Sequence, residues 1–345
     1  MHRLQDPGRD PREATRLNRG GSASKAPEPA AGRGPPRHGP SYRGRFAPSP
    51  TGPLHFGSLI AAVGSFADAR AHGGRWLVRM EDLDRVREAR GAADDILRTL
   101  DAFGLHWDEP VLYQSRRSAV YQDALLTLRA RDLTYACGCS RREIAAAGRA
   151  GAEGPIYPGT CRDGLPPGRA PRSERLRIDS ARISIDDRIQ GRFTQDIAAD
   201  VGDFVLRRAD GLHAYQLAVV VDDAEQHIDQ IVRGADLLAS APRQRLLQRL
   251  LGLPEPAYAH LPLALDTDGR KLSKSLASRP VDRSDPLPAL LAAWQFLGQQ
   301  PPSELPLTIA EFWAWAVPAW STEHIPRYRQ PPATTVTAPP PAIES

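Results

Sequence analysis

One segment constrains the fold of this chain more than any other: residues 45–58, with the sequence R-F-A-P-S-P-T-G-P-L-H-F-G-S. It begins at the end of a short apolar segment, and the three prolines and one glycine that follow exclude regular structure. An apolar run with helical spacing, Leu59 to Ala69, comes next. The segment therefore predicts a strand, a rigid turn and the N-terminus of a helix, in that order.

The predicted helix N-terminus is a candidate phosphate site. Its first backbone N–H groups have no partner within the helix, and its dipole places positive charge there. Gly57 lacks a Cβ at a point where a ligand could lie against the backbone. The alternatives are that this segment is only a turn and that His55 is an ordinary loop histidine.

A second segment, Lys271-Leu-Ser-Lys274-Ser275, contains two of the three lysines in the chain. Nearly all of the 45 Lys and Arg residues are arginine, and the third lysine is Lys25. Lysine is a compact point charge on a flexible stem, which suits a loop that holds a triphosphate. The alternative is that the two lysines are neighbours by chance.

Together, H-F-G-S (55–58) and K-L-S-K-S (271–275) resemble the two signature motifs of the class I aminoacyl-tRNA synthetases. R-F-A-P-S-P-T-G (45–52) and R-M-E-D-L-D (79–84) resemble the glutamyl/glutaminyl branch. The short form, with its cysteine cluster, resembles the glutamyl-Q tRNA(Asp) synthetases. The resemblance covers about 42–275. It implies an α/β fold: a Rossmann-like, doubly wound parallel sheet with a zinc-bearing insertion and a small helical C-terminal part.

The resemblance also implies an activity. It is that of a ligase that activates L-glutamate with ATP and Mg²⁺, without tRNA, and transfers it to the queuosine base in the anticodon of tRNA(Asp). His55, Gly57, Lys271 and Lys274 are then the catalytic residues, and His55, Gly57, Ser58 and Lys274 bind ATP. The implied glutamate-binding residues are Arg45, Phe46, Ala47, Pro48, Ser49, Glu81, Tyr215 and Arg233.

The charges of this residue set fit a glutamate substrate, which has two carboxylates and one ammonium group. An arginine fork pairs with a carboxylate through two hydrogen bonds, and Arg45 and Arg233 each lie next to the end of a predicted strand. Glu81 can hold the ammonium, and Tyr215 offers a hydroxyl beside an aromatic ring. The alternative for either arginine is an ordinary surface position.

All three cysteines of the chain lie between positions 137 and 161. In a reducing compartment, clustered thiols indicate a metal site rather than disulfides. Cys137, Cys139 and Cys161, with Tyr157, resemble the zinc site of the family, so one structural Zn²⁺ is expected. No histidine lies between positions 107 and 212, and a water molecule or Asp163 remain alternatives to Tyr157 as the fourth ligand. Thiols without metal are the other alternative, because 17 residues separate Cys139 from Tyr157.

Apolar patterns predict alternating strands and helices, which is typical of a parallel sheet with helices on its faces. Ligands bind at the carboxyl ends of such strands. The Asp210-Gly211 turn predicts a hairpin into 213–216, and Asp236 is a candidate cap for a helix over 237–251. The predicted strands are 75–80, 174–179, 182–194, 203–208 and 228–232, and the other predicted helices are 88–103, 116–131, 287–297 and 308–319.

The chain is expected to divide into six parts. The formal net charge of +4 equals the excess of basic residues in positions 1–40, so the rest is neutral and an RNA contact needs a local patch. The expected parts are a disordered basic arm (1–41), the first half of the catalytic domain (42–131), the zinc-binding insertion (132–173), the second half of the catalytic domain (174–275), a short helical region (276–328) and a disordered Pro-rich tail (329–345). The arm is alternatively an RNA tether or the product of a misassigned start codon.

No apolar run approaches the roughly 20 residues of a membrane span, so a cytoplasmic protein is expected. A monomer is expected as well. The 71 residues after Lys274 are too few for a large anticodon-binding domain. Three rival interpretations remain: a truncated glutamyl-tRNA synthetase that charges a tRNA 3′ end, a non-catalytic RNA-binding paralogue, and a zinc-ribbon interaction protein.

Overall fold

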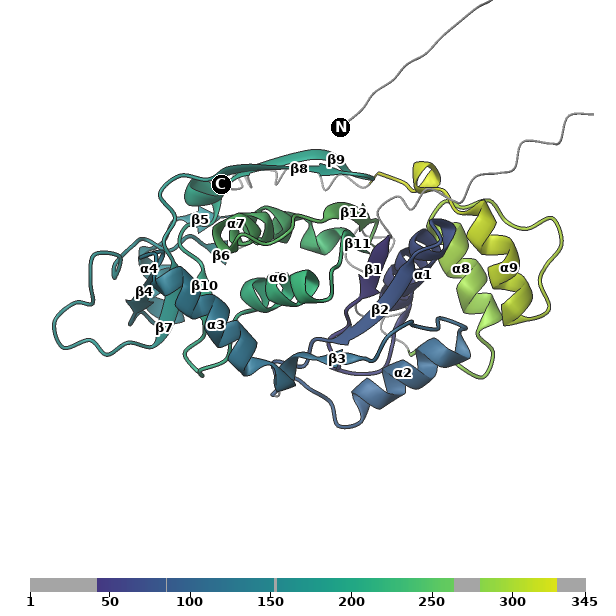
Figure 1. Ribbon diagram of the computed structural model, residues 1–345, viewed down its shortest axis with the longest axis horizontal. Coiled ribbons are helices and arrows are strands. Elements are labelled where there is room, and N and C mark those ends of the chain that lie inside the picture. The colour runs from purple at the N-terminus through teal and green to yellow at the C-terminus, as the bar shows by residue number, and fades with distance from the viewer. Residues whose placement is uncertain (1–41, 85, 152–153, 264–279, 328–345) are drawn as a thin grey trace, which may run out of the picture. The chain divides into compact units, whose positions relative to one another are not determined.

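The structure is a computed structural model, shown in Figure 1, and it describes residues 42–84, 86–151, 154–263 and 280–327. The predicted disordered arm, the Pro-rich tail and both lysines of the 271–275 motif lie outside these residues.

The centre of the protein is a parallel sheet built from two groups of strands. The first group has the order β1-β2-β3, and β11 pairs in parallel with β12 in the second. The groups meet where β1 lies beside β11, since the N–H of Asp229 donates to the carbonyl of Arg43 over 3.2 Å. The strands are β1 (Arg43–Phe46), β2 (Arg75–Met80), β3 (Leu112–Tyr113), β11 (Gln230–Gly234) and β12 (Ala257–Leu261).

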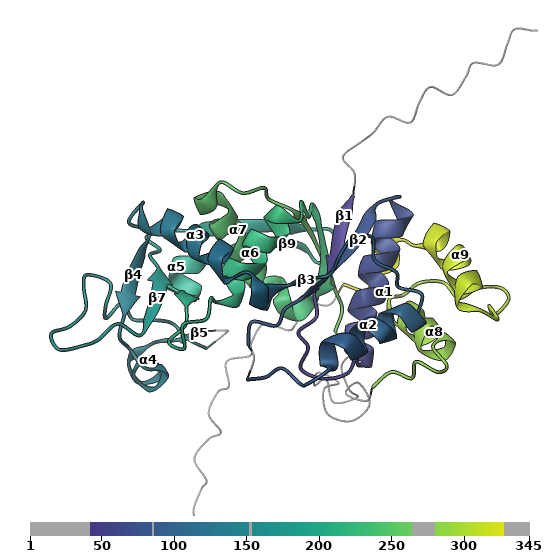
Figure 2. The same cartoon turned by 60° about the horizontal axis from the view of Figure 1, so that its bottom comes forward.

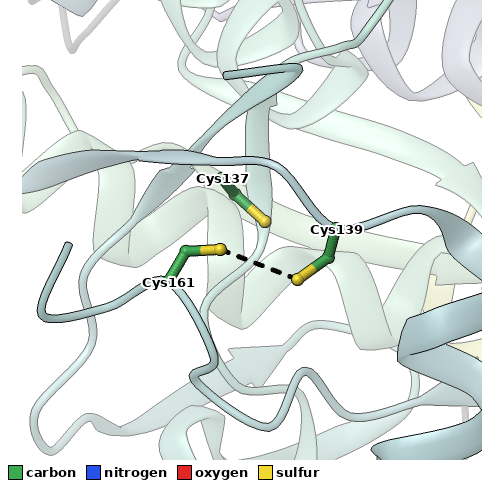
Figure 3. A group of neighbouring side chains, drawn as sticks. All are labelled: Cys137, Cys139 and Cys161. Atoms are coloured by element: carbon green, nitrogen blue, oxygen red, sulfur yellow. Dashed lines mark hydrogen bonds between the residues drawn. The ribbon is translucent and has the colours of Figure 1, made fainter. Parts of the chain in front are cut away.

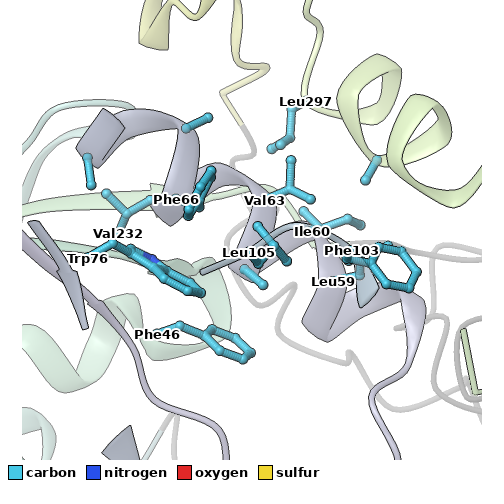
Figure 4. Packing of buried hydrophobic residues seen from close by; sticks show 14 of the residues in the cluster. Phe46, Leu59, Ile60, Val63, Phe66, Trp76, Phe103, Leu105, Val232 and Leu297 are labelled. Atoms are coloured by element: carbon cyan, nitrogen blue, oxygen red, sulfur yellow. The ribbon is translucent and has the colours of Figure 1, made fainter. Parts of the chain in front are cut away.

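Helices cover both faces of this sheet. Successive side chains of a strand point to opposite faces, and here the side chains on both faces are buried. On β2, Trp76, Val78 and Met80 join one hydrophobic cluster and Leu77 joins another. Figure 4 shows the first cluster, which α1 (Phe56–Ala71) fills with Leu59, Ile60, Val63 and Phe66. The doubly wound parallel fold that the sequence predicts is therefore confirmed.

The helices divide between the two clusters. With α1 pack α2 (Ala92–Ala102), α8 (Leu287–Phe296) and α9 (Ile309–Ala319), and α8 and α9 lie beside α1 in both Figure 1 and Figure 2. On the opposite face pack α3 (Ser118–Arg129), α6 (Tyr215–Glu225) and α7 (Ala241–Leu251). Short 3₁₀ turns cover Gln114–Arg116, Ala235–Ser240 and Thr322–His324.

A separate antiparallel sheet of order β10-β7-β4 carries the cysteine cluster. A hairpin of β8 and β9 joins the central sheet by one pairing, between Asp187 and Tyr258 of β12. These elements are β4 (Thr134–Cys137), α4 (Arg141–Ala147), β5 (Ala150–Gly151), β6 (Gly154–Pro155), β7 (Ser173–Leu176), β8 (Arg182–Asp187), β9 (Gly191–Asp196), α5 (Ile197–Asp200) and β10 (Val205–Arg207).

Three local predictions need correction. The strand predicted over 182–194 is two strands, and the turn between them ends at Gly191, whose φ of +79° suits glycine. The hairpin predicted into 213–216 consists of a single bridge, Arg207 to His213, because α6 begins at Tyr215. Asp236 does not cap the following helix, since a 3₁₀ turn over Ala235–Ser240 intervenes and Ser240 is the N-cap residue of α7.

The helices in the described part of the chain are all too short or too polar to cross a membrane.

Candidate active site

A cavity of about 620 Å³ opens at the carboxyl ends of β1, β11 and β12. The chain leaves β1 toward β2 on one side and leaves β11 toward β12 on the other, so strand order reverses between β1 and β11. Doubly wound sheets bind their ligands at such a reversal. The cavity is therefore the candidate active site.

The N-terminus of α1 forms one wall of this cavity. His55 is its N-cap residue: the backbone is extended, and Nδ1 accepts a hydrogen bond from the N–H of Ser58 over 3.3 Å. The Ser58 hydroxyl lies 3.1 Å from Nε2 of the same ring. A Cβ on Gly57 would lie 3.3 Å from the His55 ring, so glycine leaves the imidazole its place beside the helix end.

The structure brings all eight predicted glutamate-binding residues to the cavity wall, with His55, Gly57 and Ser58. They come from distant parts of the sequence. The first five lie in β1 or directly after it, Glu81 follows β2, Tyr215 begins α6 and Arg233 lies in β11. Lys271 and Lys274, the other two predicted catalytic residues, lie outside the described residues.

A buried ion network holds Arg45 and Glu81 in place. Nε of Arg45 donates to the carboxylate of Asp223 over 3.0 Å, and Nη1 of Arg79 lies 2.8 Å from the same carboxylate. Nη2 of Arg79 also donates to Glu81 over 3.4 Å. Both arginines and Asp223 are at most 3% exposed, so these pairings form out of contact with water.

The carboxylates of this network have opposite pKa shifts. Burial raises the pKa of Glu81, and the neighbouring carboxylates of Asp222 and Asp223 add to it against the attraction of Arg79 and Arg45. Burial also acts on Asp223, but Arg45 and Arg79 outweigh it and lower its pKa. The lowered pKa favours the ionised form of Asp223, and a cationic ligand beside Glu81 would favour the ionised form of Glu81 as well. Burial, then the charge of Glu81, raises the pKa of the Tyr215 phenol.

Arg233 is anchored through two of its three nitrogen atoms. Nε donates to Nε2 of His260 over 3.1 Å, and Nη2 donates to the carbonyl of Leu237 over 3.2 Å. Nη1 is buried and has no hydrogen-bond partner among the described residues. An arginine with spare donors at a cavity wall suits an anionic ligand.

No sequence pattern predicted a functional role for Arg79, Asp222, Asp223 or His260. A signal for the two aspartates was present, because they directly follow an apolar run of valines in α6. Acidic residues inside an apolar helix are buried only when they are paired. The partners themselves could not be found from the sequence.

The cysteine cluster has the geometry of a metal site. The three sulfur atoms of Cys137, Cys139 and Cys161 all lie within 4.8 Å of one another. Figure 3 shows the three side chains converging on one point. The sulfur atoms of Cys139 and Cys161 are 3.7 Å apart. A tetrahedral zinc ion with Zn–S bonds of 2.3 Å would hold its sulfur ligands about 3.8 Å apart. The donor set and its spacing therefore fit zinc.

Tyr157 completes this cluster as a potential fourth ligand. Its hydroxyl oxygen lies 3.4 Å from the sulfur of Cys137 and 3.7 Å from that of Cys139. The alternative ligand, Asp163, is exposed and does not belong to the group of close metal-binding side chains. The N–H of Cys161 donates to the Tyr157 oxygen over 2.8 Å, which orients it toward the sulfurs.

Comparisons with known proteins show the family of this chain. Residues 41–299 match the family described as tRNA synthetases class I (E and Q), catalytic domain. A protein of Dechloromonas aromatica named glutamyl-Q tRNA(Asp) synthetase is 58% identical over 83% of this chain and 96% of its own length. One of Chromobacterium violaceum with the same name is 54% identical over 83% of this chain and 95% of its own. This chain belongs to the glutamyl-Q tRNA(Asp) synthetase family.

Membership makes the chain a ligase of the class I synthetases, as the sequence motifs predict. A solved relative, a glutamate tRNA ligase from Elizabethkingia meningosepticum in complex with its amino acid, superposes with a TM-score of 0.70 at 25% identity. The superposition covers 84% of this chain and 66% of that one, so this chain spans just under two thirds of its length. The class I fold is thereby established independently of the close relatives.

Proposed function

We propose that this glutamyl-Q tRNA(Asp) synthetase family member activates L-glutamate with ATP, without tRNA, and transfers it to queuosine in the anticodon of tRNA(Asp). The observation that carries the proposal is the gathering of Arg45, Glu81, Tyr215 and Arg233 beside a helix N-terminus at one cavity. Two arginines and one glutamate at the cavity wall match the two carboxylates and one ammonium of glutamate.

Glutamate would bind with its ammonium at Glu81 and its carboxylates at the two arginines. An incoming cation favours the ionised form of Glu81, whose pKa is raised by burial. Arg233 retains an unpaired Nη1 among the described residues, and the hydroxyl of Tyr215 can add a hydrogen bond. Phe46, Ala47, Pro48 and Ser49 would form the floor of the pocket.

ATP, with Mg²⁺, would bind at the N-terminus of α1. In the activation step an oxygen of the glutamate α-carboxylate attacks the α-phosphorus, the bond to the β-phosphate oxygen breaks, and pyrophosphate leaves with that electron pair. Charge accumulates on the phosphoryl oxygens. His55 and the positive end of the α1 dipole, beside Gly57 and Ser58, would stabilise it on one side, and Lys271 and Lys274 would supply the opposing cations.

Zinc would have a structural role in the part of the chain that we assign to the insertion, residues 132–173. Cys137, Cys139, Cys161 and Tyr157 would hold one ion, which would tie the end of β4 to the loop before β7. The cluster belongs to the β10-β7-β4 sheet and the activation residues to the central one. The metal is therefore assigned no part in the activation step.

In the second step a hydroxyl of queuosine attacks the activated carbonyl carbon, and AMP leaves. The nearest alternative is a glutamyl-tRNA synthetase that charges a tRNA 3′ end. Glutamate-dependent exchange of labelled pyrophosphate into ATP, measured without RNA, tests the proposed activation. We expect exchange. No exchange from folded protein would reject tRNA-independent activation.

A further inference from the structure

A buried chain of three polar side chains connects the β8–β9 hairpin to the cavity wall. Oδ2 of Asp187 lies 2.6 Å from Nδ1 of His260, whose Nε2 accepts from Arg233. All three residues are at most 5% exposed. His260 and Arg233 are direct neighbours across the β11–β12 pairing, so the contact is built into the strand register.

The chemistry of arginine fixes the tautomer of this histidine. Nε of Arg233 can only donate, so Nε2 of His260 must accept and cannot carry a proton. The one proton of the neutral ring then sits on Nδ1 and is donated to Asp187. Burial lowers the pKa of His260, which is consistent with a neutral ring beside a guanidinium.

Backbone donors fix the carboxylate at the start of the chain. Oδ1 of Asp187 accepts from the N–H groups of Ile189, Gln190 and His260, over 3.0, 2.8 and 3.1 Å. Only Oδ2 is left to face the imidazole. The carboxylate therefore has a single orientation. Its hydrogen bond fixes the ring of His260, and the ring in turn fixes the plane of the Arg233 guanidinium.

We infer that Asp187 and His260 are positioning residues for glutamate recognition: they lock the guanidinium of Arg233 so that its remaining donors meet a substrate carboxylate. The inference rests on the proposed function, in which Arg233 binds glutamate. A guanidinium held on Nε and Nη2 has little freedom to turn, so less rotamer entropy is lost when the substrate binds.

Asp187→Asn tests the inference with almost no change in shape. The three backbone donors keep the amide oxygen at the Oδ1 position, so the NH₂ group faces Nδ1 of His260. Nδ1 must then accept, the ring proton moves to Nε2, and it opposes the N–H of Arg233. We expect the KM for glutamate in pyrophosphate exchange to rise at least about tenfold, with the KM for ATP unchanged.

Asp186→Asn is the matched control, because it removes the same charge one position earlier from a side chain that is 79% exposed. It should leave both KM values unchanged. A folded Asp187→Asn protein with a normal KM for glutamate would overturn the inference. Absence of exchange by the unsubstituted protein would reject the proposed function instead.

If the Asp187→Asn protein does not fold, the tautomer of His260 can be measured in protein that keeps Asp187. Nitrogen-15 NMR of histidine-labelled protein, with the His260 signal assigned by its loss in His260→Gln, should show a neutral ring with its proton on Nδ1. An imidazolium, or a proton on Nε2, would overturn the inference.

Discussion

The buried ion network of Arg45, Arg79 and Asp223 predicts an unusually large loss of unfolding free energy for Asp223→Ala. Asp223 is 3% exposed and bonds two buried arginines, over 3.0 Å to Arg45 and 2.8 Å to Arg79. Removing one member of a buried charge pair costs about 3–5 kcal/mol, because it leaves the partner charge desolvated and unpaired. Two guanidinium groups lose a partner here, so the loss should lie at the upper end of that range.

The assay is urea unfolding of both the substituted and the unsubstituted protein. The matched control is Glu255→Gln, which breaks ion pairs at 34% exposure with Arg249 and Arg245 and should cost less than about 1 kcal/mol. Asp223→Asn should fall between the two, because the amide oxygen still accepts one hydrogen bond. A loss for Asp223→Ala no larger than that of the surface control would refute the reasoning.

Three further predictions concern the activity and the metal. Because burial raises the pKa of Glu81 and only its ionised form attracts an ammonium, the KM for glutamate should fall as pH rises through that pKa. Glu81→Gln should abolish this pH dependence; a KM profile identical to that of the unsubstituted protein would contradict it. Elemental analysis should find about one zinc per chain, lost in Cys137→Ser, and metal-free protein with three titratable thiols would disprove the zinc site. Lys274→Ala should slow pyrophosphate exchange by about 100-fold, and Lys274→Arg should fail as well, because a planar fork does not replace a point charge; near-normal exchange by the arginine variant would count against a need for lysine.

The sequence was sufficient where local patterns determine structure. The proline turn before His55 and the apolar spacing after it predicted α1, and the run Arg75–Met80 predicted β2. The fold class followed from the alternation of strands and helices, which depends on neighbours in the chain. The eight residues that line one cavity were implied by the resemblance to the synthetase family and not by local patterns.

The sequence was insufficient where structure depends on pairing between distant segments. The contact between Arg233 and His260 exists because their strands pair in one particular register, which no local pattern specifies. The same holds for Asp223, whose partners lie in β1 and β2. The predicted cap at Asp236 was wrong for a different reason: a 3₁₀ turn precedes the helix, which begins at Ala241, and local propensity does not distinguish the two starts.

The central claim is that glutamate is attached at the anticodon of tRNA(Asp), and an isolated anticodon stem-loop tests it most directly. Labelled glutamate, ATP and the protein are incubated with a stem-loop that carries queuosine and with a second one that carries guanosine at that position. The account predicts labelling of the queuosine stem-loop alone. If neither stem-loop accepts glutamate while tRNA(Glu) is charged at its 3′ end, the protein charges tRNA for translation and the account is contradicted.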